Sequence, residues 1–184
     1  MFKKTGEMVR GSFRGYLQTL FLAVFFVLLV GLFCGCSDQK VILSTGQTAP
    51  AFSLSDINGK TWRFPEDLKG KVVAIRFWAD WCKSCAEEMP VIEKVYDKYK
   101  DKGLVILAIN IGQEKAPVVK FVNGITITYP VLLDPGAVVT KRFGVTGLPI
   151  TFIIDGDGII RQKILGEAGQ TVFEEFVREQ LKRT

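Results

Sequence analysis

The chain begins with a continuously apolar stretch, and its remainder alternates apolar and polar positions with the periods of strands and helices. The 23 residues from Gly15 to Ser37 carry no charge. A helix of about 20 apolar residues spans the hydrocarbon core of a bilayer. Basic residues precede this run, which predicts a cytoplasmic N-terminus and a domain outside. We therefore expect residues 1–36 to be a signal sequence, lipoprotein signal or transmembrane anchor, and residues 37–49 to be a linker. This places the protein on the outer face of the cytoplasmic membrane or in the periplasm.

Residues 50–184 have the pattern of one α/β domain. Phe52–Ser55 and Trp62–Phe64 alternate around a turn-forming segment, which predicts a β-hairpin. Val72–Trp78 and Leu104–Ile109 are apolar almost throughout, as in strands of a sheet that is covered on both faces.

A helix is predicted between these two strands, from Lys83 to Lys100, because apolar residues recur there every three or four positions. Pro90 lies inside this helix, and we expect a kink there because proline has no N–H. Strand, helix and strand then form a βαβ unit. The other predicted elements are helices starting around Pro117, at Ala137–Phe143 and after a capping box of Thr171 and Glu174, and strands at Val131–Leu133, Ile150–Ile154 and Ile159–Ile164.

Composition and charge exclude several classes of function. Of the net charge of +5, residues 1–36 contribute four basic residues and one acidic residue, so the rest of the chain carries only +2. No basic cluster with interleaved aromatic residues occurs, and we expect no nucleic-acid partner. The chain contains no histidine, which removes Cys-His catalytic pairs and His-ligated zinc, copper or haem. We expect neither a metal site nor a cofactor.

Two of the four cysteines, Cys34 and Cys36, follow directly on the apolar run. Gly35-Cys36 resembles the lipobox of bacterial lipoproteins, in which a small residue precedes the lipidated cysteine. Phe33 departs from that pattern, which usually has leucine at this position. We predict lipidation at Cys36. An uncleaved anchor with two spectator thiols and an ordinary signal peptide remain open.

The other two cysteines, Cys82 and Cys85, are three residues apart at the predicted start of a helix. They lie on one face and can close a disulfide. The helix N-terminus presents partial positive charge to the first sulfur, and Lys83 adds a cation, so Cys82 is the expected attacking thiolate and Cys85 the resolving thiol. Zinc binding would need four ligands, which this chain lacks. An inert disulfide closing so short a loop would constrain the unfolded chain little.

Glu88 follows Cys85 by three residues and is its neighbour on the predicted helix. A partly buried carboxyl there would have a raised pKa and could take up the proton of Cys85. The alternative is a solvated glutamate, a description that fits Glu87 better because it points away. The spacing alone leaves both readings of Glu88 open.

The segment Trp78–Cys85, followed by Pro90, resembles a thioredoxin-fold active site. The preceding hairpin, the Cys-x-x-Cys-x-x-Glu-x-Pro pattern and the membrane address resemble the TlpA/ResA-like extracytoplasmic branch, over about Thr48 to Gly166. The resemblance implies a thioredoxin-like three-layer sandwich, with a central mixed sheet and an added N-terminal β-hairpin. It also implies a thiol-disulfide oxidoreductase in which Cys82 attacks, Cys85 resolves and Glu88 assists.

The same resemblance implies a cis-proline at Pro149, opposite the thiols. The expected substrate-binding rim comprises Trp81, Lys83, Ser84, Leu148 and Pro149. The expected partners are protein disulfides and an upstream thiol electron donor, with the protein acting as a monomeric reductase, including in cytochrome c maturation. Two departures stand out. Family members commonly have proline where Ser84 stands, and Arg76 replaces the buried aspartate of cytosolic thioredoxins, which shifts proton handling toward Glu88.

Three rival readings have weaker support. A peroxiredoxin would place its cysteine in a Pro-x-x-x-Thr/Ser-x-x-Cys setting, and copper-carrying relatives add a distant histidine; this chain has neither. Asp155–Gly158 superficially suggests a calcium loop, but it lacks the third oxygen ligand and the distant glutamate. A hairpin turn is the better interpretation of that segment.

Overall fold

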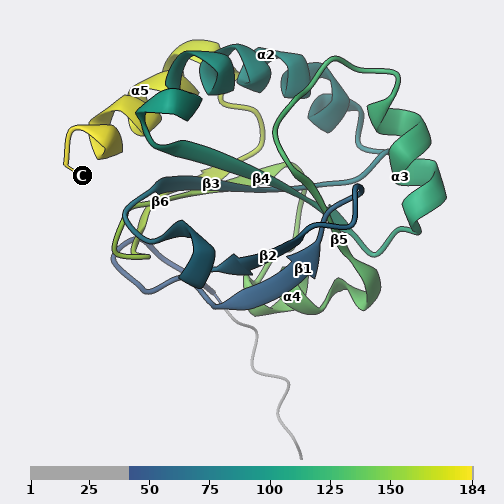
Figure 1. Cartoon of the computed structure of the whole chain (residues 1–184), viewed down its shortest axis with the longest axis horizontal. Helices are drawn as coiled ribbons and strands as arrows, with labels where there is room; N and C mark the ends of the chain where they lie inside the picture. The colour runs from purple at the N-terminus through teal and green to yellow at the C-terminus, as the bar shows by residue number, and fades with distance from the viewer. Residues whose placement is uncertain (1–41, 184) are drawn as a thin grey trace, which may run out of the picture. The chain divides into compact units, whose positions relative to one another are not determined.

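A mixed five-stranded sheet with the order β5-β4-β3-β6-β7 forms the centre of the domain (Figure 1). The structure, a computed structural model, describes residues 42–183; the predicted membrane address and Cys36 lie outside the described residues. In the sheet, β3, β4 and β5 are parallel, whereas β6 and β7 run antiparallel to their neighbours. The strands are β3 (Val72–Trp78), β4 (Leu104–Ile111), β5 (Val131–Asp134), β6 (Ile150–Ile154) and β7 (Ile160–Leu165).

The central strand β3 is buried at every position, as its apolar run predicts. Successive side chains of a strand point to opposite faces. Val72, Ala74 and Trp78 accordingly belong to one apolar cluster, and Val73 belongs with the next odd-numbered residues to a second cluster on the other face. Arg76 lies in the first of these alternating sets, so its charge points into an apolar layer.

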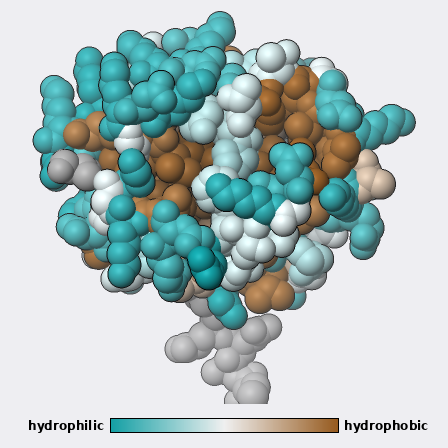
Figure 2. Space-filling model, in the orientation of Figure 1, coloured by the Kyte–Doolittle hydropathy of each residue, from teal (hydrophilic) through white to brown (hydrophobic). Residues whose placement is uncertain are grey.

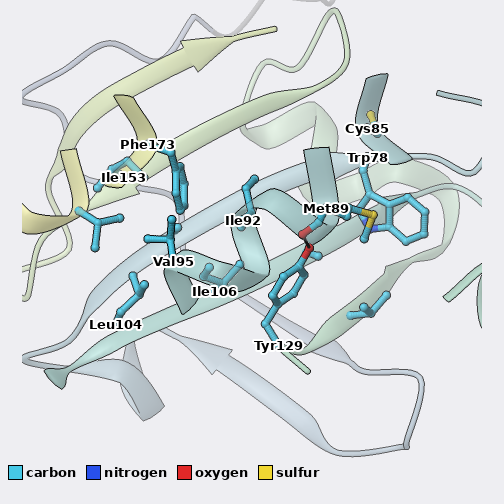
Figure 3. Close-up of a cluster of buried hydrophobic side chains, with 14 of the residues drawn as sticks. Trp78, Cys85, Met89, Ile92, Val95, Leu104, Ile106, Tyr129, Ile153 and Phe173 are labelled. Atoms are coloured by element: carbon cyan, nitrogen blue, oxygen red, sulfur yellow. Dashed lines mark hydrogen bonds between the residues drawn. The ribbon is translucent and has the colours of Figure 1, made fainter. Parts of the chain in front are cut away.

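Three helices cover that face: α2 (Lys83–Tyr99), α3 (Lys115–Val122) and α5 (Gly169–Leu181) (Figure 1). Met89, Ile92 and Val95 of α2 are buried, in agreement with the predicted apolar face. Figure 3 shows these side chains together with Trp78 and Ile106 of the sheet. The helix continues through Pro90 to Tyr99. Within residues 42–183, none of the helices combines the length and apolar character that crossing a bilayer requires.

The hairpin of β1 (Phe52–Ser55) and β2 (Thr61–Phe64), together with the short helix α4 (Val138–Arg142), covers the opposite face (Figure 1). Phe143 packs there in edge-on or tilted contacts with aromatic rings of β1, β3 and β6. The backbone before β1 also joins the domain, since the N–H groups of Gly46 and Ala49 donate to carbonyls in the β6–β7 segment. On the face shown in Figure 2, hydrophilic side chains surround apolar patches.

Two predicted helix starts are wrong. The helix predicted at Ala137–Phe143 begins only at Val138, because a 3-10 turn over Pro135–Ala137 precedes it and Ala137 adopts a left-handed conformation with φ 55°. The predicted capping box of Thr171 and Glu174 lies inside α5, which begins at Gly169. Short 3-10 segments also occur at Glu66–Leu68 and Lys100–Lys102.

Candidate active site

The two cysteines of the domain form a disulfide at the start of α2. The chain leaves β3 at Trp78, and Cys82 is the N-cap residue of the helix. Its sulfur is bonded to that of Cys85, with 5.2 Å between the two Cα atoms, and it accepts a hydrogen bond of 3.3 Å from the Cys85 N–H. Cys85 is fully buried, while Cys82 remains 7% exposed. The more accessible sulfur is therefore the one predicted to attack.

The position of Cys82 suits a thiolate. The first N–H groups of a helix have no partner within the helix, and the helix dipole adds partial positive charge at this end. In the oxidised protein the acceptor of the Cys85 N–H is a disulfide sulfur; it stands in for the thiolate of the reduced form. A helix N-terminus lowers the pKa of a cysteine and so increases its nucleophilic fraction at neutral pH. The geometry can support thiol-disulfide exchange without any bound cofactor.

A groove of about 670 Å³ opens beside Cys82. Four of the five predicted rim residues line it: Trp81, Lys83, Ser84 and Leu148. The fifth, Pro149, is buried and does not line the groove, and the Leu148–Pro149 peptide bond is cis as predicted. The other lining residues are Glu87, Ile111, Thr140, Val145, Thr146 and Gly147.

The two tryptophans near the cysteines lie in different environments, as predicted. Trp78 is fully buried in the core, whereas Trp81 is 69% exposed at the groove. Glu87 and Lys83 are also solvent-exposed and approach each other to 3.6 Å across one helical turn. Exposed ion pairs are weak, so this one does little to hold the two side chains in place. Both side chains can therefore contact a partner.

Glu88, in contrast, is buried and has three donors around its carboxyl group. Its Oε2 accepts from the Arg76 guanidinium at 2.6 Å. Its Oε1 accepts from the backbone N–H groups of Ala168 and Gly169, at 2.8 and 3.1 Å. Glu88 thus provides the N-terminal cap of α5 that the sequence had assigned to Thr171. Glu88 is therefore not the solvated glutamate of the alternative, and its role toward the Cys85 proton stays a prediction.

Sequence reasoning missed a second polar network beside the cysteines. The side chain of Gln113, in the loop after β4, bonds to both the backbone N–H and the carboxylate of Asp80. Asn110 Nδ2 donates to the same Gln113 oxygen at 2.8 Å. Asp80 precedes Cys82 by two residues, so this network fixes the segment that carries the attacking sulfur. The one sequence signal for this network was a polar residue, Asn110, directly after the apolar run Leu104–Ile109.

The Asp155–Gly158 segment is a hairpin turn between β6 and β7. The carboxylate of Asp155 accepts from the N–H groups of Asp157 and Ile159, and from Arg161 at 2.6 Å. These contacts occupy the oxygens that a cation would need. No cluster of acidic, cysteine or histidine side chains suited to a metal ion occurs within residues 42–183.

Comparison with known proteins agrees with this geometry. Residues 45–163 match the family model described as AhpC/TSA family. The chain is 35% identical over 167 residues to the thiol-disulfide oxidoreductase ResA of Bacillus thuringiensis subsp. konkukian, a match that covers 88% of this chain and 96% of the relative.

Two solved structures show the same fold. A thiol:disulfide interchange protein of the thioredoxin family from Chlorobium tepidum superposes with a TM-score of 0.68 and 27% identity, covering 76% of this chain and 99% of that one. The exposed lipoprotein thioredoxin Etrx1 of Streptococcus pneumoniae gives a TM-score of 0.64 and 27% identity, covering 71% and 99%. The predicted thioredoxin-like fold is thereby confirmed. The chain belongs to the thioredoxin-fold AhpC/TSA family and, within it, to the ResA-like thiol-disulfide oxidoreductases.

Proposed function

We propose that this oxidoreductase is a reductase of protein disulfides, and that it works as a monomer outside the cytoplasm. The observation that carries the proposal is the pairing of Cys82, which lines the groove at a helix N-terminus and is 7% exposed, with a fully buried Cys85. Only the first sulfur can be reached by a partner protein. The second is protected and reacts after the first has formed a bond.

The reaction then has two steps. The Cys82 thiolate attacks one sulfur of a partner disulfide, and the other partner sulfur leaves as a thiolate. Cys85 loses its proton and attacks the Cys82 sulfur, which releases the second partner sulfur and forms the Cys82–Cys85 disulfide. Two electrons have passed to the partner, and its two thiolates take up protons. An upstream dithiol must reduce the Cys82–Cys85 disulfide again. We propose Glu88 as the group that governs the proton of Cys85.

The groove supplies the binding surface for the partner chain. Trp81 offers a large exposed aromatic face, and Lys83 and Ser84 lie next to the reacting sulfur. Leu148 also lines the groove, and the cis peptide bond to the buried Pro149 follows it. A partly apolar groove with few fixed charges suits an extended polypeptide rather than one small charged molecule.

The location is also part of the proposal. Residues 1–36 would carry the domain across the cytoplasmic membrane, with lipid attached at Cys36. Support comes from the uncharged run, the Gly35-Cys36 pair and the likeness to a protein named an exposed lipoprotein thioredoxin. Labelled palmitate fed to expressing cells should enter the wild-type protein and not the Cys36→Ala variant. Unchanged labelling in that variant would contradict lipidation at this residue. Cytochrome c maturation is the proposed pathway, and a c-type cytochrome precursor is therefore the first partner to test.

Trapping tests the reaction directly. A Cys85→Ala variant of the full chain should accumulate a mixed disulfide between Cys82 and its partner, visible as a band that reductant removes. The Cys82→Ala variant is the matched control and should trap nothing. Wild-type protein should reduce insulin disulfides, and Cys82→Ser should not. Reduction of peroxide without insulin turnover would instead favour a peroxidase, and stoichiometric copper binding without turnover would favour a metal carrier.

A further inference from the structure

Arg76 is a charged side chain in the middle of the central strand, and it is only 2% exposed. Its Nη2 donates to Glu88 Oε2, and its Nη1 donates to Thr151 Oγ1 at 3.0 Å. Its Nε has no partner among residues 42–183. A buried guanidinium is costly unless a counter-charge compensates it. Glu88 supplies that counter-charge, and the buried carboxylate of Glu88 in turn needs the cation of Arg76.

The contacts of Glu88 suit a carboxylate and not a carboxylic acid. All three of its neighbours are donors: the guanidinium on one oxygen and two backbone N–H groups on the other. A protonated carboxyl would need an acceptor for its own hydrogen, and the structure provides none at either oxygen. The donors around Glu88 thus match a carboxylate, and this group lies one helical turn from Cys85.

A carboxylate beside Cys85 would oppose formation of the Cys85 thiolate if it stood alone. Like charges a few ångströms apart repel strongly in a buried site. Arg76 brings the local charge back to zero. It reaches this position because β3 alternates, which directs its side chain toward α2 together with Ala74 and Trp78.

We propose that Arg76 is a positioning residue that compensates the charge of Glu88, so that Cys85 can lose its proton in the resolving step. In that step the Cys85 proton leaves, the Cys85–Cys82 bond forms and the Cys82–partner bond breaks, with a proton finally taken up by the released partner thiolate. Arg76 takes no part in the bond changes. The inference rests on the proposed exchange reaction, and deepens it by identifying what controls its second half.

The other ionisable groups near this pair do not replace Arg76. Tyr129 donates its hydroxyl to the Met89 carbonyl (Figure 3), and burial raises the pKa of Tyr129 well above its usual value, so it stays neutral. Glu93 on α2 is held by the backbone and hydroxyl of Thr128. Lys83 and Glu87 are exposed at the helix start, and the half-buried Asp80 is bonded to Gln113. Arg76 is the one cation in direct contact with Glu88 among the described residues.

The experiment follows the reactivity of Cys85 against pH in the full chain, in a Cys82→Ser background. Trypsin cleaves after Lys83, so the peptide Ser84–Lys94 contains Cys85 alone and its alkylation can be quantified by mass spectrometry. Arg76→Gln keeps a donor for Glu88 but removes the charge. We expect it to move the midpoint of Cys85 alkylation upward by about one pH unit or more, which slows alkylation about tenfold at neutral pH.

Two further variants separate charge from structure. Arg76→Lys keeps the cation, and its midpoint should stay near that of the parent. The double variant Arg76→Gln/Glu88→Gln has no buried charge at this position and should also return toward the parent. An unchanged midpoint in Arg76→Gln, or a double variant shifted as far as the single one, would overturn the inference. If Arg76→Gln fails to fold, the double variant Arg76→Gln/Glu88→Gln tests the inference instead. A midpoint of Cys85 alkylation far from that of the parent would then overturn the inference.

Failure of this inference can be told apart from failure of the proposed function. If the protein reduces insulin through Cys82 but Arg76→Gln leaves the midpoint of Cys85 alkylation unchanged, the proposed function stands and only this inference is wrong. A protein that reduces no disulfide would lose the function itself, whatever the alkylation profile shows.

Discussion

The side-chain amide of Gln113 binds Asp80 at two points: its Nε2 donates to Asp80 Oδ1 at 2.6 Å, and its Oε1 accepts from the Asp80 N–H at 3.0 Å. Asp80 belongs to the turn that ends at Cys82, where the Cys82 N–H donates to the Ala79 carbonyl. A residue 33 positions away in the chain therefore holds the turn that aims the attacking sulfur.

Removing this contact should impair exchange more than it impairs folding. Gln113→Ala leaves the Asp80 N–H and carboxylate without their partner, and loosens the position of Cys82. We expect a loss of about 1–2 kcal/mol in the free energy of unfolding and a several-fold fall in the rate of insulin reduction. Glu114→Ala is the matched control, because the neighbouring Glu114 side chain makes no capping bond to α3. Equal rates in the two variants would contradict this role for Gln113.

Trp81 should matter for partner binding and not for stability. Its side chain is 69% exposed at the groove, so truncation leaves no cavity. Trp81→Ala should raise the KM for a protein disulfide several-fold, while the free energy of unfolding changes by no more than about 0.5 kcal/mol. Val172→Ala, an exposed apolar residue on α5, serves as the control. A large fall in melting temperature with unchanged KM would show that Trp81 is structural instead.

The turn before α4 allows a test of backbone strain. Ala137 adopts φ 55°, a conformation that costs a non-glycine residue about 1–2 kcal/mol. Ala137→Gly should relieve this cost, partly offset by the greater freedom of glycine in the unfolded chain, for a net gain of about 0.5 kcal/mol. Gly136→Ala is the opposite change at φ 76°, where no neighbour would touch an added Cβ. It should destabilise by about 1 kcal/mol. Urea denaturation of both variants measures the two effects, which must differ in sign.

Local patterns in the sequence were sufficient to predict most of the scaffold. The β-branched and aromatic run of β3, the apolar spacing of α2 and the turn chemistry of the two hairpins each depend on neighbours in the chain. The spacing of Cys82 and Cys85 was likewise sufficient to place them at a helix start. The cis bond at Pro149 followed from family resemblance and not from local chemistry.

Contacts between distant residues account for what the sequence did not predict. The Thr171–Glu174 pattern has the residues of a capping box, but Glu88 from α2, 81 positions before Gly169, caps α5 instead. Glu174 bonds to Lys98 and Tyr99. The pairing of Arg76 with Glu88 similarly depends on the packing of α2 over β3. Spacing along one helix cannot reveal which strand residue will face it.

The Asp155 turn predicts how stability depends on acid pH. Burial of Asp155 opposes its ionisation, but hydrogen bonds from the Ile159 N–H, Arg161 and the Asp157 N–H outweigh burial and hold the pKa of Asp155 below its usual value. A carboxyl whose pKa is lower in the folded state stabilises the protein above its unfolded pKa of about 3.9. That contribution is lost as the pH falls from about 4 toward the lower folded pKa.

Asp155→Asn should therefore remove part of this acid dependence. Asparagine suits the turn but cannot ionise, so the variant should lose about 1–3 kcal/mol of unfolding free energy at neutral pH, where the wild-type contacts are charge-assisted. Below pH 4 the wild-type and variant curves should converge, because the wild-type carboxyl then becomes protonated. Urea denaturation over a pH series measures this, with Asp157→Asn as control, since the Asp157 side chain is exposed and only its backbone bonds within the turn. Parallel curves for wild type and Asp155→Asn, with no convergence in acid, would show that the turn owes its stability to shape alone and not to the charge of Asp155.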